Sequence, residues 1–288
     1  VYSLGLSLSY EMILGIFINY FYPIFVTHRP ISPIPIVITI LASIFILSII
    51  CYIYDKNYSV YIHIQSSWWD MRSTIWFLFI PFLSIFGSYL FSCYSKTTLL
   101  LIMLAIISII PGLVIFNKIN AKIYPIVIWI ISLSLTLYGT LNYPNLFFDT
   151  GWEYYLAKIV MNNGFWDSNF PPVRNNSMLY SVLLHPLLSI FCNIDLFLTY
   201  KIVNPILCSF APLVAYSIFN KQTYDEKISF ISTILILFMF TFYTWFAPNT
   251  RQGGGFLFLS LVILTTFDKL LSKINRKILL LTFAFSLI

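Results

Sequence analysis

Long apolar runs follow one another along this chain and constrain its fold more than any other feature. A helix needs about 20 apolar residues to cross roughly 30 Å of hydrocarbon. We expect spans at 3–26, 34–54, 74–93, 97–116, 123–141, 199–219, 228–246 and 255–271, with a ninth beginning near 278. The sequence therefore predicts an all-α integral membrane protein, a polytopic bundle of about eight to nine spans.

The composition excludes a soluble domain. Hydrophobic residues make up 59% of the chain and charged residues 9%, and the mean hydropathy is +0.88. A soluble domain carries about 25% charged residues. The net charge of +6 is then a marker of loop topology, and we expect no nucleic-acid partner. Four cysteines lie in or beside apolar runs without metal-site spacing and behave as small hydrophobic residues: Cys51, Cys93, Cys192 and Cys208.

Both ends of the chain lie inside apolar runs, so we expect it to be a fragment of a longer protein, truncated at the C-terminus.

One polar stretch, 146–176, interrupts the apolar pattern. It places five charged residues among aromatic ones: Asp149, Glu153, Lys158, Asp167 and Arg174. Ionisable groups are expensive near lipid and mark functional sites there. If the protein has chemistry, we expect it in this stretch.

The run from 178 to 197 decides the topology of everything after it. It is apolar, but His185-Pro186 interrupts it and Asn193 and Asp195 end it early. If it does not span, four loops share one side and hold ten of the sixteen Lys and Arg: 55–73, 117–122, 220–227 and 268–277. The positive-inside rule favours this arrangement. We therefore expect an integral protein of the cell membrane in which 142–198 form one extracytoplasmic region.

The polar stretch also predicts a helix lying flat on the membrane. Trp152, Tyr155, Leu156, Ile159 and Val160 repeat with helical spacing and form one apolar face. Asn163-Gly164 is expected to end this helix.

The two acids of this helix allow two interpretations. Thr150 and Glu153 match a capping box, and Asp149 could be either a helix cap or a simple helix-start charge. Alternatively, Asp149 and Glu153 lie one turn apart and present two carboxylates, which can act as a base or hold a hard cation such as Mg²⁺ or Mn²⁺.

A second candidate region lies near 251. Arg251 and Gln252 are expected in an external turn, and the glycines at 253–255 open the helix that follows. Free N–H groups at a helix start and a bidentate Arg suit a phosphate, although the Arg could instead extend along the membrane surface beside its helix. Arg174, in the external region, is a further substrate-binding candidate.

The order of elements resembles the GT-C type of membrane glycosyltransferase, which includes protein mannosyltransferases and oligosaccharyltransferases. An external loop with an acid just after a span is followed by a flat helix, a Pro-Pro piece and paired spans. The segments DTGWEYYLAKIVMNNGFWD, NNSMLYSVLLHPLLS and YKIVNPILCSFAPLVAY, and the later RQ, look like an uncharacterised archaeal membrane-protein family grouped with them.

This resemblance implies a catalytic carboxylate at Asp149 and a second acid at Glu153. Relatives often carry a His between the two, where this chain has Gly151. It further implies that 1–122 are additional N-terminal helices and that 123–288 form a GT-C-like catalytic module.

The resemblance implies an inverting transfer of a sugar from a polyprenyl-phosphate donor to a protein, lipid or glycan acceptor at the outer face. Asp149 and Glu153 would be catalytic, and Arg251, Gln252 and Arg174 would bind substrate. The partners are then the lipid-linked sugar and membrane lipids. The alternatives are a transporter or flippase of lipid-linked or polar solutes, which should carry polar residues at mid-membrane, and a scaffold without catalytic activity.

Overall fold

The fold is entirely helical over the residues that the structure, a computed structural model, describes: 1–25, 28–54, 71–143, 145–146 and 148–287. No strand occurs among these residues. The all-α prediction is therefore confirmed for the described part of the chain.

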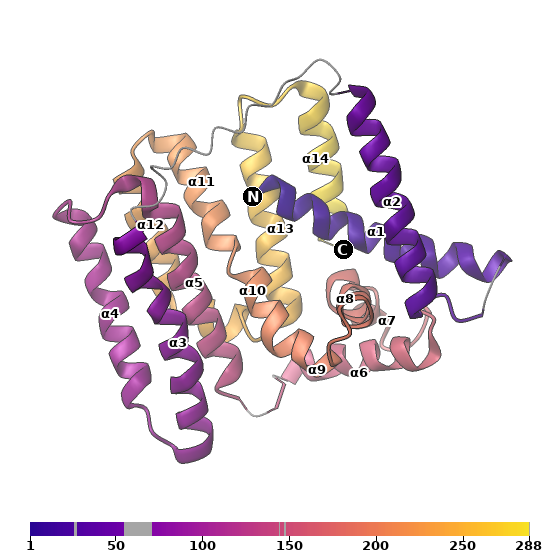
Figure 1. Cartoon of the computed structure of the whole chain (residues 1–288), viewed down its shortest axis with the longest axis horizontal. Coiled ribbons are helices and arrows are strands. Elements are labelled where there is room, and N and C mark those ends of the chain that lie inside the picture. Colours follow the sequence, from indigo (N-terminus) through magenta and orange to yellow (C-terminus); the bar gives the residue numbers. More distant parts are fainter. Residues whose placement is uncertain (26–27, 55–70, 144, 147, 288) are drawn as a thin grey trace.

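Among the described residues, fourteen α-helices and several short 3-10 or π-helical turns follow one another (Figure 1). Their bounds are α1 Tyr2–Phe25, α2 Pro33–Tyr54, α3 Met71–Tyr94, α4 Thr98–Ile115, α5 Tyr124–Leu141, α6 Phe148–Asn163, α7 Val173–Asn176, α8 His185–Cys192, α9 Leu196–Leu198, α10 Asn204–Cys208, α11 Ala211–Thr223, α12 Glu226–Phe238, α13 Thr250–Phe267 and α14 Lys273–Phe285. The first five helices match the predicted spans to within three residues at each end.

Within the part of the chain that the structure describes, six helical segments are long and apolar enough to cross a membrane: 2–25, 33–53, 76–94, 98–115, 121–141 and 196–223. The protein is therefore suited to a membrane, and the larger number of eight to nine spans stays a prediction. The expected helix 228–246 is wrong as a single element. α12 ends at Phe238 because Met239 adopts an extended backbone, and a separate π-helical turn follows at Phe242–Phe246.

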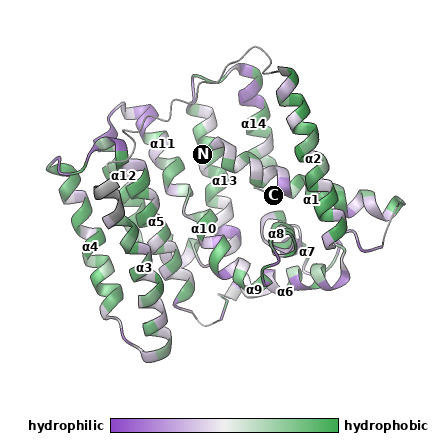
Figure 2. Cartoon of the chain, in the orientation of Figure 1, coloured by the Kyte–Doolittle hydropathy of each residue, from purple (hydrophilic) through white to green (hydrophobic). Residues whose placement is uncertain are grey.

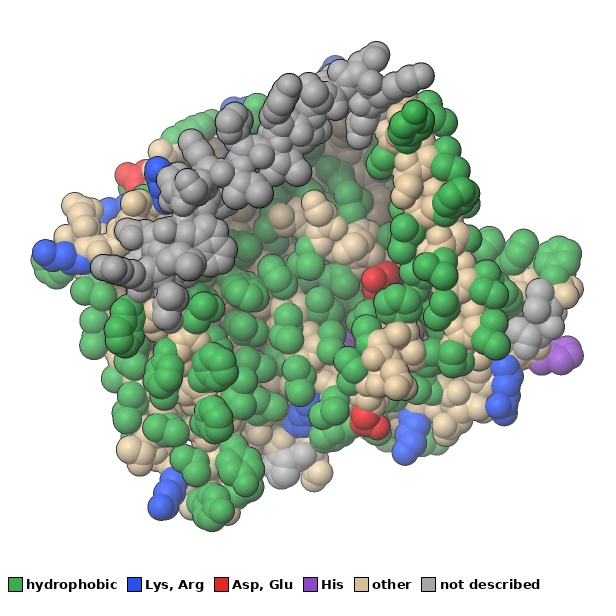
Figure 3. Space-filling model, viewed as in Figure 1, with side chains coloured by type: hydrophobic (Ala, Val, Ile, Leu, Met, Phe, Trp, Pro, Cys, Tyr) green, Lys and Arg blue, Asp and Glu red, His purple; other side chains and the backbone are tan. Residues whose placement is uncertain are grey.

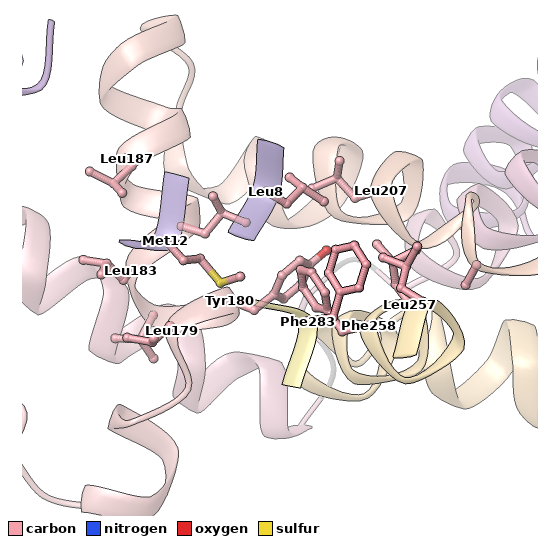
Figure 4. Close-up of a cluster of buried hydrophobic side chains, with 14 of the residues drawn as sticks. Leu8, Met12, Leu179, Tyr180, Leu183, Leu187, Leu207, Leu257, Phe258 and Phe283 are labelled. Carbon is pink, nitrogen blue, oxygen red and sulfur yellow. The ribbon is translucent and has the colours of Figure 1, made fainter. Parts of the chain in front are cut away.

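The helices bury two apolar cores. In the first, side chains from α1, the 179–187 segment, α10, α13 and α14 meet around Tyr180 and Phe258 (Figure 4). The second joins α3, α4, α5 and α12, with Ile107, Val127 and Phe230 fully buried. Helices from the first 122 residues pack into both cores, and the division into two units at 122/123 stays a prediction.

The outer surface is apolar as well. Trp76, Phe79 and Leu101 are all more than half exposed, and many similar side chains surround them. Hydrophobic residues predominate on α2 to α5 (Figure 2), and charged side chains are few on the face that Figure 3 shows. A monomer in water rarely exposes so large an apolar surface, which a lipid environment would cover.

The 178–197 segment does not resemble the spans. Its helical part, Tyr180–Cys192, is shorter than a membrane span, and α8 is seen almost end-on where α4, α5 and α13 run up the page (Figure 1). Val182, Leu183 and Leu184 are fully buried. This geometry favours the non-spanning topology.

Basic loops gather at one end of the bundle. The Nζ of Lys227 donates to the Ile115 carbonyl at 2.6 Å, and Lys221 pairs with Asp268 at 2.9 Å. The loops after α4, α11 and α13 therefore lie together, as the charge count predicts. Most of the 55–73 loop lies outside the described residues.

Cysteine labelling tests this topology. In a background without the four native cysteines, Asn169→Cys should react with an impermeant thiol reagent from outside, because Asn169 is exposed beyond α6. Asn120→Cys and Ser272→Cys, exposed at the basic end, should react only after the membrane is opened. Labelling of Asn169→Cys and Ser272→Cys from the same side would mean that 178–197 spans.

Candidate functional site

The helix α6 positions two carboxyl groups on one face. It begins at Phe148, so Asp149 and Glu153 lie four residues apart and face the same side. The buried side of α6 is formed by Thr150, Glu153, Leu156, Ala157 and Val160. Of the predicted apolar face, Leu156 and Val160 are buried, whereas Trp152 and Tyr155 are exposed; that this face lies on a membrane stays a prediction. The end of the helix is confirmed, since α6 stops at Asn163 and Gly164 takes a φ of +66°.

Arg251 belongs to a helix rather than to a turn. α13 begins at Thr250, five residues earlier than predicted, so Arg251 and Gln252 lie in its first helical turn. The end of α13 at Phe267 is about 25 Å away at 1.5 Å per residue. That end lies with the basic loops, so Arg251 sits at the opposite end of the bundle.

Arg251 joins the two acids. Its Nη2 donates to Asp149 Oδ2 at 2.9 Å, and its Nε lies 4.0 Å from Glu153 Oε1. The Asp149 side chain is 47% exposed, that of Arg251 20% and that of Glu153 0%. The three groups therefore form a column from the surface inward, with the cation in the middle.

Glu153 is buried without adequate hydrogen bonds. Burial raises the pKa of this carboxyl to about 8, the Arg251 charge opposes the rise and the Asp149 charge adds to it. The backbone N–H of Arg251 and the Ser181 side chain also favour the ionised form, but among the described residues neither carboxyl oxygen has a partner with hydrogen-bond geometry. Glu153 is therefore mainly protonated at neutral pH.

The capping-box interpretation does not describe this helix. Thr150 is the third residue of α6, and its hydroxyl donates to the Pro248 carbonyl at 2.8 Å. The same hydroxyl accepts from the Thr250 backbone N–H at 3.2 Å. Thr150 therefore ties α6 to the start of α13, which brings Asp149 within reach of Arg251.

The glycines at 253–255 allow close packing within α13. A Cβ at Gly254 would lie 2.5 Å from the Tyr180 ring, and one at Gly253 would clash with Cys208 Sγ. Gly255 has open space. The expectation that these glycines open the helix is wrong, because α13 already begins at Thr250; close packing accounts for two of them.

The other predicted substrate-binding residues differ in their placement. Gln252 is half-buried beside Arg251, and its Oε1 has no hydrogen-bond partner among the described residues. Arg174 is exposed on α7, and no ion pair among the described residues joins it to Asp149 or Glu153. The structure thus brings Asp149, Glu153, Arg251 and Gln252 together, without a contact from Arg174.

Two asparagines that the sequence analysis did not single out lie beside the start of α13, near Arg251. Asn249 is fully buried before Arg251, with neither side-chain atom hydrogen-bonded among the described residues. Asn204 donates to the Ala247 carbonyl at 3.2 Å and accepts from the Tyr180 hydroxyl at 3.1 Å. A polar residue inside an apolar run, as in Asn204-Pro205, is the signal that could have found the second.

Two of the cavities among the described residues lie beside α13 or α6. One of about 20 Å³ touches Arg251, Tyr180 and Ser181, which is room for about one water molecule. A larger one of about 420 Å³ opens beside Lys158 and Asn162. Since 158 and 162 project from α6 on the side away from the acids, the larger cavity is separate from the ion pair.

The residues present provide an incomplete site for Mg²⁺ or Mn²⁺. Asp149 already bonds the guanidinium, and Glu153 is mainly protonated. No cluster of three His, Cys, Asp or Glu occurs in the part of the chain that the structure describes. A divalent cation prefers several oxygen ligands, so it does not fit while Arg251 holds its present place.

Comparisons with known proteins add no relative. No family model matches the chain, and neither does any curated protein or solved structure.

The raised pKa of Glu153 predicts a pH-dependent stability. The folded protein keeps the proton up to about pH 8, whereas the ordinary value for an exposed Glu is 4.5. The contribution of Glu153 to stability should therefore be greatest below pH 4.5 and fall as pH rises toward 8, by at most about 1.4 kcal/mol per pH unit. Thermal unfolding of the detergent-solubilised protein between pH 5 and 8 measures this.

Glu153→Gln should flatten that dependence, because Gln keeps the shape and cannot ionise. The control is Glu226→Gln, since Glu226 is exposed on α12, and it should keep the slope of the original protein. A Glu153→Gln variant with that same slope would contradict a protonated Glu153.

Proposed function

We propose that this chain is a membrane glycosyltransferase that transfers a sugar from a polyprenyl-phosphate donor to an acceptor at the outer face. The observation that carries the proposal is the column of Asp149, Arg251 and Glu153, in which a half-exposed carboxylate and a guanidinium meet at one end of an apolar bundle. A base and a phosphate-binding cation are the two groups that this reaction needs.

The reaction assigns a role to each group. The acceptor hydroxyl attacks the anomeric carbon and gives its proton to the Asp149 carboxylate. The bond between that carbon and the phosphate oxygen breaks, and its electron pair leaves with the polyprenyl phosphate. Attack opposite to the leaving group inverts the anomeric centre. Arg251 stabilises the charge on the departing phosphate through a bidentate contact.

Arg251 can bind either of two partners, the Asp149 carboxylate or the donor phosphate. Without donor, its Nη2 bonds Asp149 Oδ2 at 2.9 Å. A donor phosphate competes for the same guanidinium, and its binding releases Asp149 to accept a proton. The pair therefore couples donor binding to the activation of the base.

Glu153 favours this exchange by remaining neutral. It lies beneath Arg251 with its side chain fully buried, and burial holds its pKa at about 8. A protonated carboxyl leaves the charge of Arg251 free for Asp149 or phosphate. It also limits the number of unpaired charges in the site, which are costly in a buried place.

Substitution at Asp149 tests the assignment. Asp149→Asn keeps the size but cannot take the acceptor proton, so kcat should fall by about 10²–10⁴, the range for general acid–base groups. The measurement is sugar transfer from a polyprenyl-phosphate donor in membranes, at equal protein levels. Asp167→Asn is the matched control, because Asp167 is exposed. Its Oδ1 accepts a hydrogen bond from the Asn169 backbone N–H, and the side-chain oxygen of an Asn can accept the same bond.

Near-normal transfer by Asp149→Asn would end the glycosyltransferase assignment of this site. Partial recovery of that variant with raised Mg²⁺ or Mn²⁺ would instead indicate that a cation shares the carboxylates.

A further inference from the structure

Lys201 makes an unusual set of contacts at the edge of the site. Its Nζ donates to three backbone carbonyls, those of Thr140 at 2.9 Å, Tyr143 at 2.6 Å and Asn145 at 2.8 Å. The residue is only 7% exposed. An ammonium group has three N–H donors, and here all three are used.

These carbonyls share an origin. Thr140 lies in the last turn of α5, and Tyr143 and Asn145 belong to the connection from α5 to α6. The last carbonyls of a helix lack intrahelical partners, and a cation there interacts favourably with the helix dipole. The Nζ of Lys201 therefore caps the C-terminal end of α5 and also binds two carbonyls that follow that helix.

The held connection leads directly to Asp149. Asn145 precedes Asp149 by four residues, and Thr150, the next residue after Asp149, is fixed to Pro248 at 2.8 Å. Asp149 thus lies between two anchors. Lys201, Tyr200 and Pro248 line one cavity of only about 10 Å³, so there is little empty space beside the two anchors.

We propose that Lys201 is a positioning residue for Asp149. It binds the carbonyl of Thr140 at the end of α5 and those of Tyr143 and Asn145 between α5 and α6. This inference rests on the proposed function for its catalytic part, and the anchoring itself does not. The convergence of three carbonyls on one atom suits an ammonium better than the planar fork of Arg.

Lys201→Met tests the proposal, because Met keeps the unbranched side chain and removes the charge and the three donors. We expect kcat for sugar transfer to fall by about 10²-fold, the effect of a displacement of about 1 Å of a reacting group. The KM for the donor should change little, since Arg251 is untouched.

Lys227→Met is the control variant. Lys227 also caps a helix, with its Nζ 2.6 Å from the Ile115 carbonyl and 3.1 Å from Asn117 Oδ1, but at the basic end of the bundle. It should leave kcat unchanged. If Lys201→Met keeps the kcat of the original protein, the positioning role is wrong.

The labelling rate of a thiol tests the anchoring by Lys201 without an activity assay. Leu146→Cys, in a background without native cysteines, should label slowly because Leu146 is half-buried against Leu196 and Tyr200. Adding Lys201→Met should raise the labelling rate, and adding Lys227→Met should not. An unchanged rate with Lys201→Met overturns the anchor, even if the protein transfers no sugar.

Lys201→Arg covers the case in which the Met variant does not fold. It keeps a cation at the end of α5, so it should preserve slow labelling of Leu146→Cys while lowering kcat less than Met does. If Lys201→Arg makes Leu146→Cys label as fast as the exposed Asn169→Cys, the proposal is overturned.

Discussion

The contact between Asp149 and Arg251 is the interaction on which the site depends. It joins the first turns of two helices 102 residues apart in the chain. Thr150 reinforces it by bonding Pro248 and the Thr250 backbone. The glycines of α13 serve the same arrangement, because they let that helix approach Tyr180 and Cys208 closely. Packing and polar contacts thus place one carboxylate against one guanidinium at the external end of the proposed topology.

The burial of Glu153 determines how that pair can behave. An ionised Glu153 would compete with Asp149 for the guanidinium and would leave a buried charge in need of a partner. Because burial raises its pKa to about 8, the neutral acid leaves Asp149 as the main partner of Arg251. The pair is half-exposed on the Asp149 side, so an incoming anion can reach it. In the resting protein, the Asp149 carboxylate therefore occupies the guanidinium for which the donor phosphate competes.

The sequence predicted the broad features because they follow from local patterns. Apolar length located α1 to α5, Asn163-Gly164 located the end of α6, and loop charge predicted that the basic loops lie together. It also singled out Asp149, Glu153 and Arg251, which the structure brings into contact. What it missed depends on distant contacts. The roles of Thr150 and Lys201 appear only when Pro248 and the end of α5 are placed beside them, and the break at Met239 lies inside a run of uniform hydropathy.

The most direct test of the central claim is the affinity of the solubilised protein for a polyprenyl phosphate, compared between the original chain and Asp149→Asn. If Asp149 and the phosphate compete for Arg251, removing the Asp149 charge should tighten binding, by up to about tenfold for about 1.4 kcal/mol of lost competition. Arg251→Gln should abolish the difference between the two Asp149 forms. Unchanged or weaker binding by Asp149→Asn would contradict the claim, because Arg251 would then not be shared between the carboxylate and the donor.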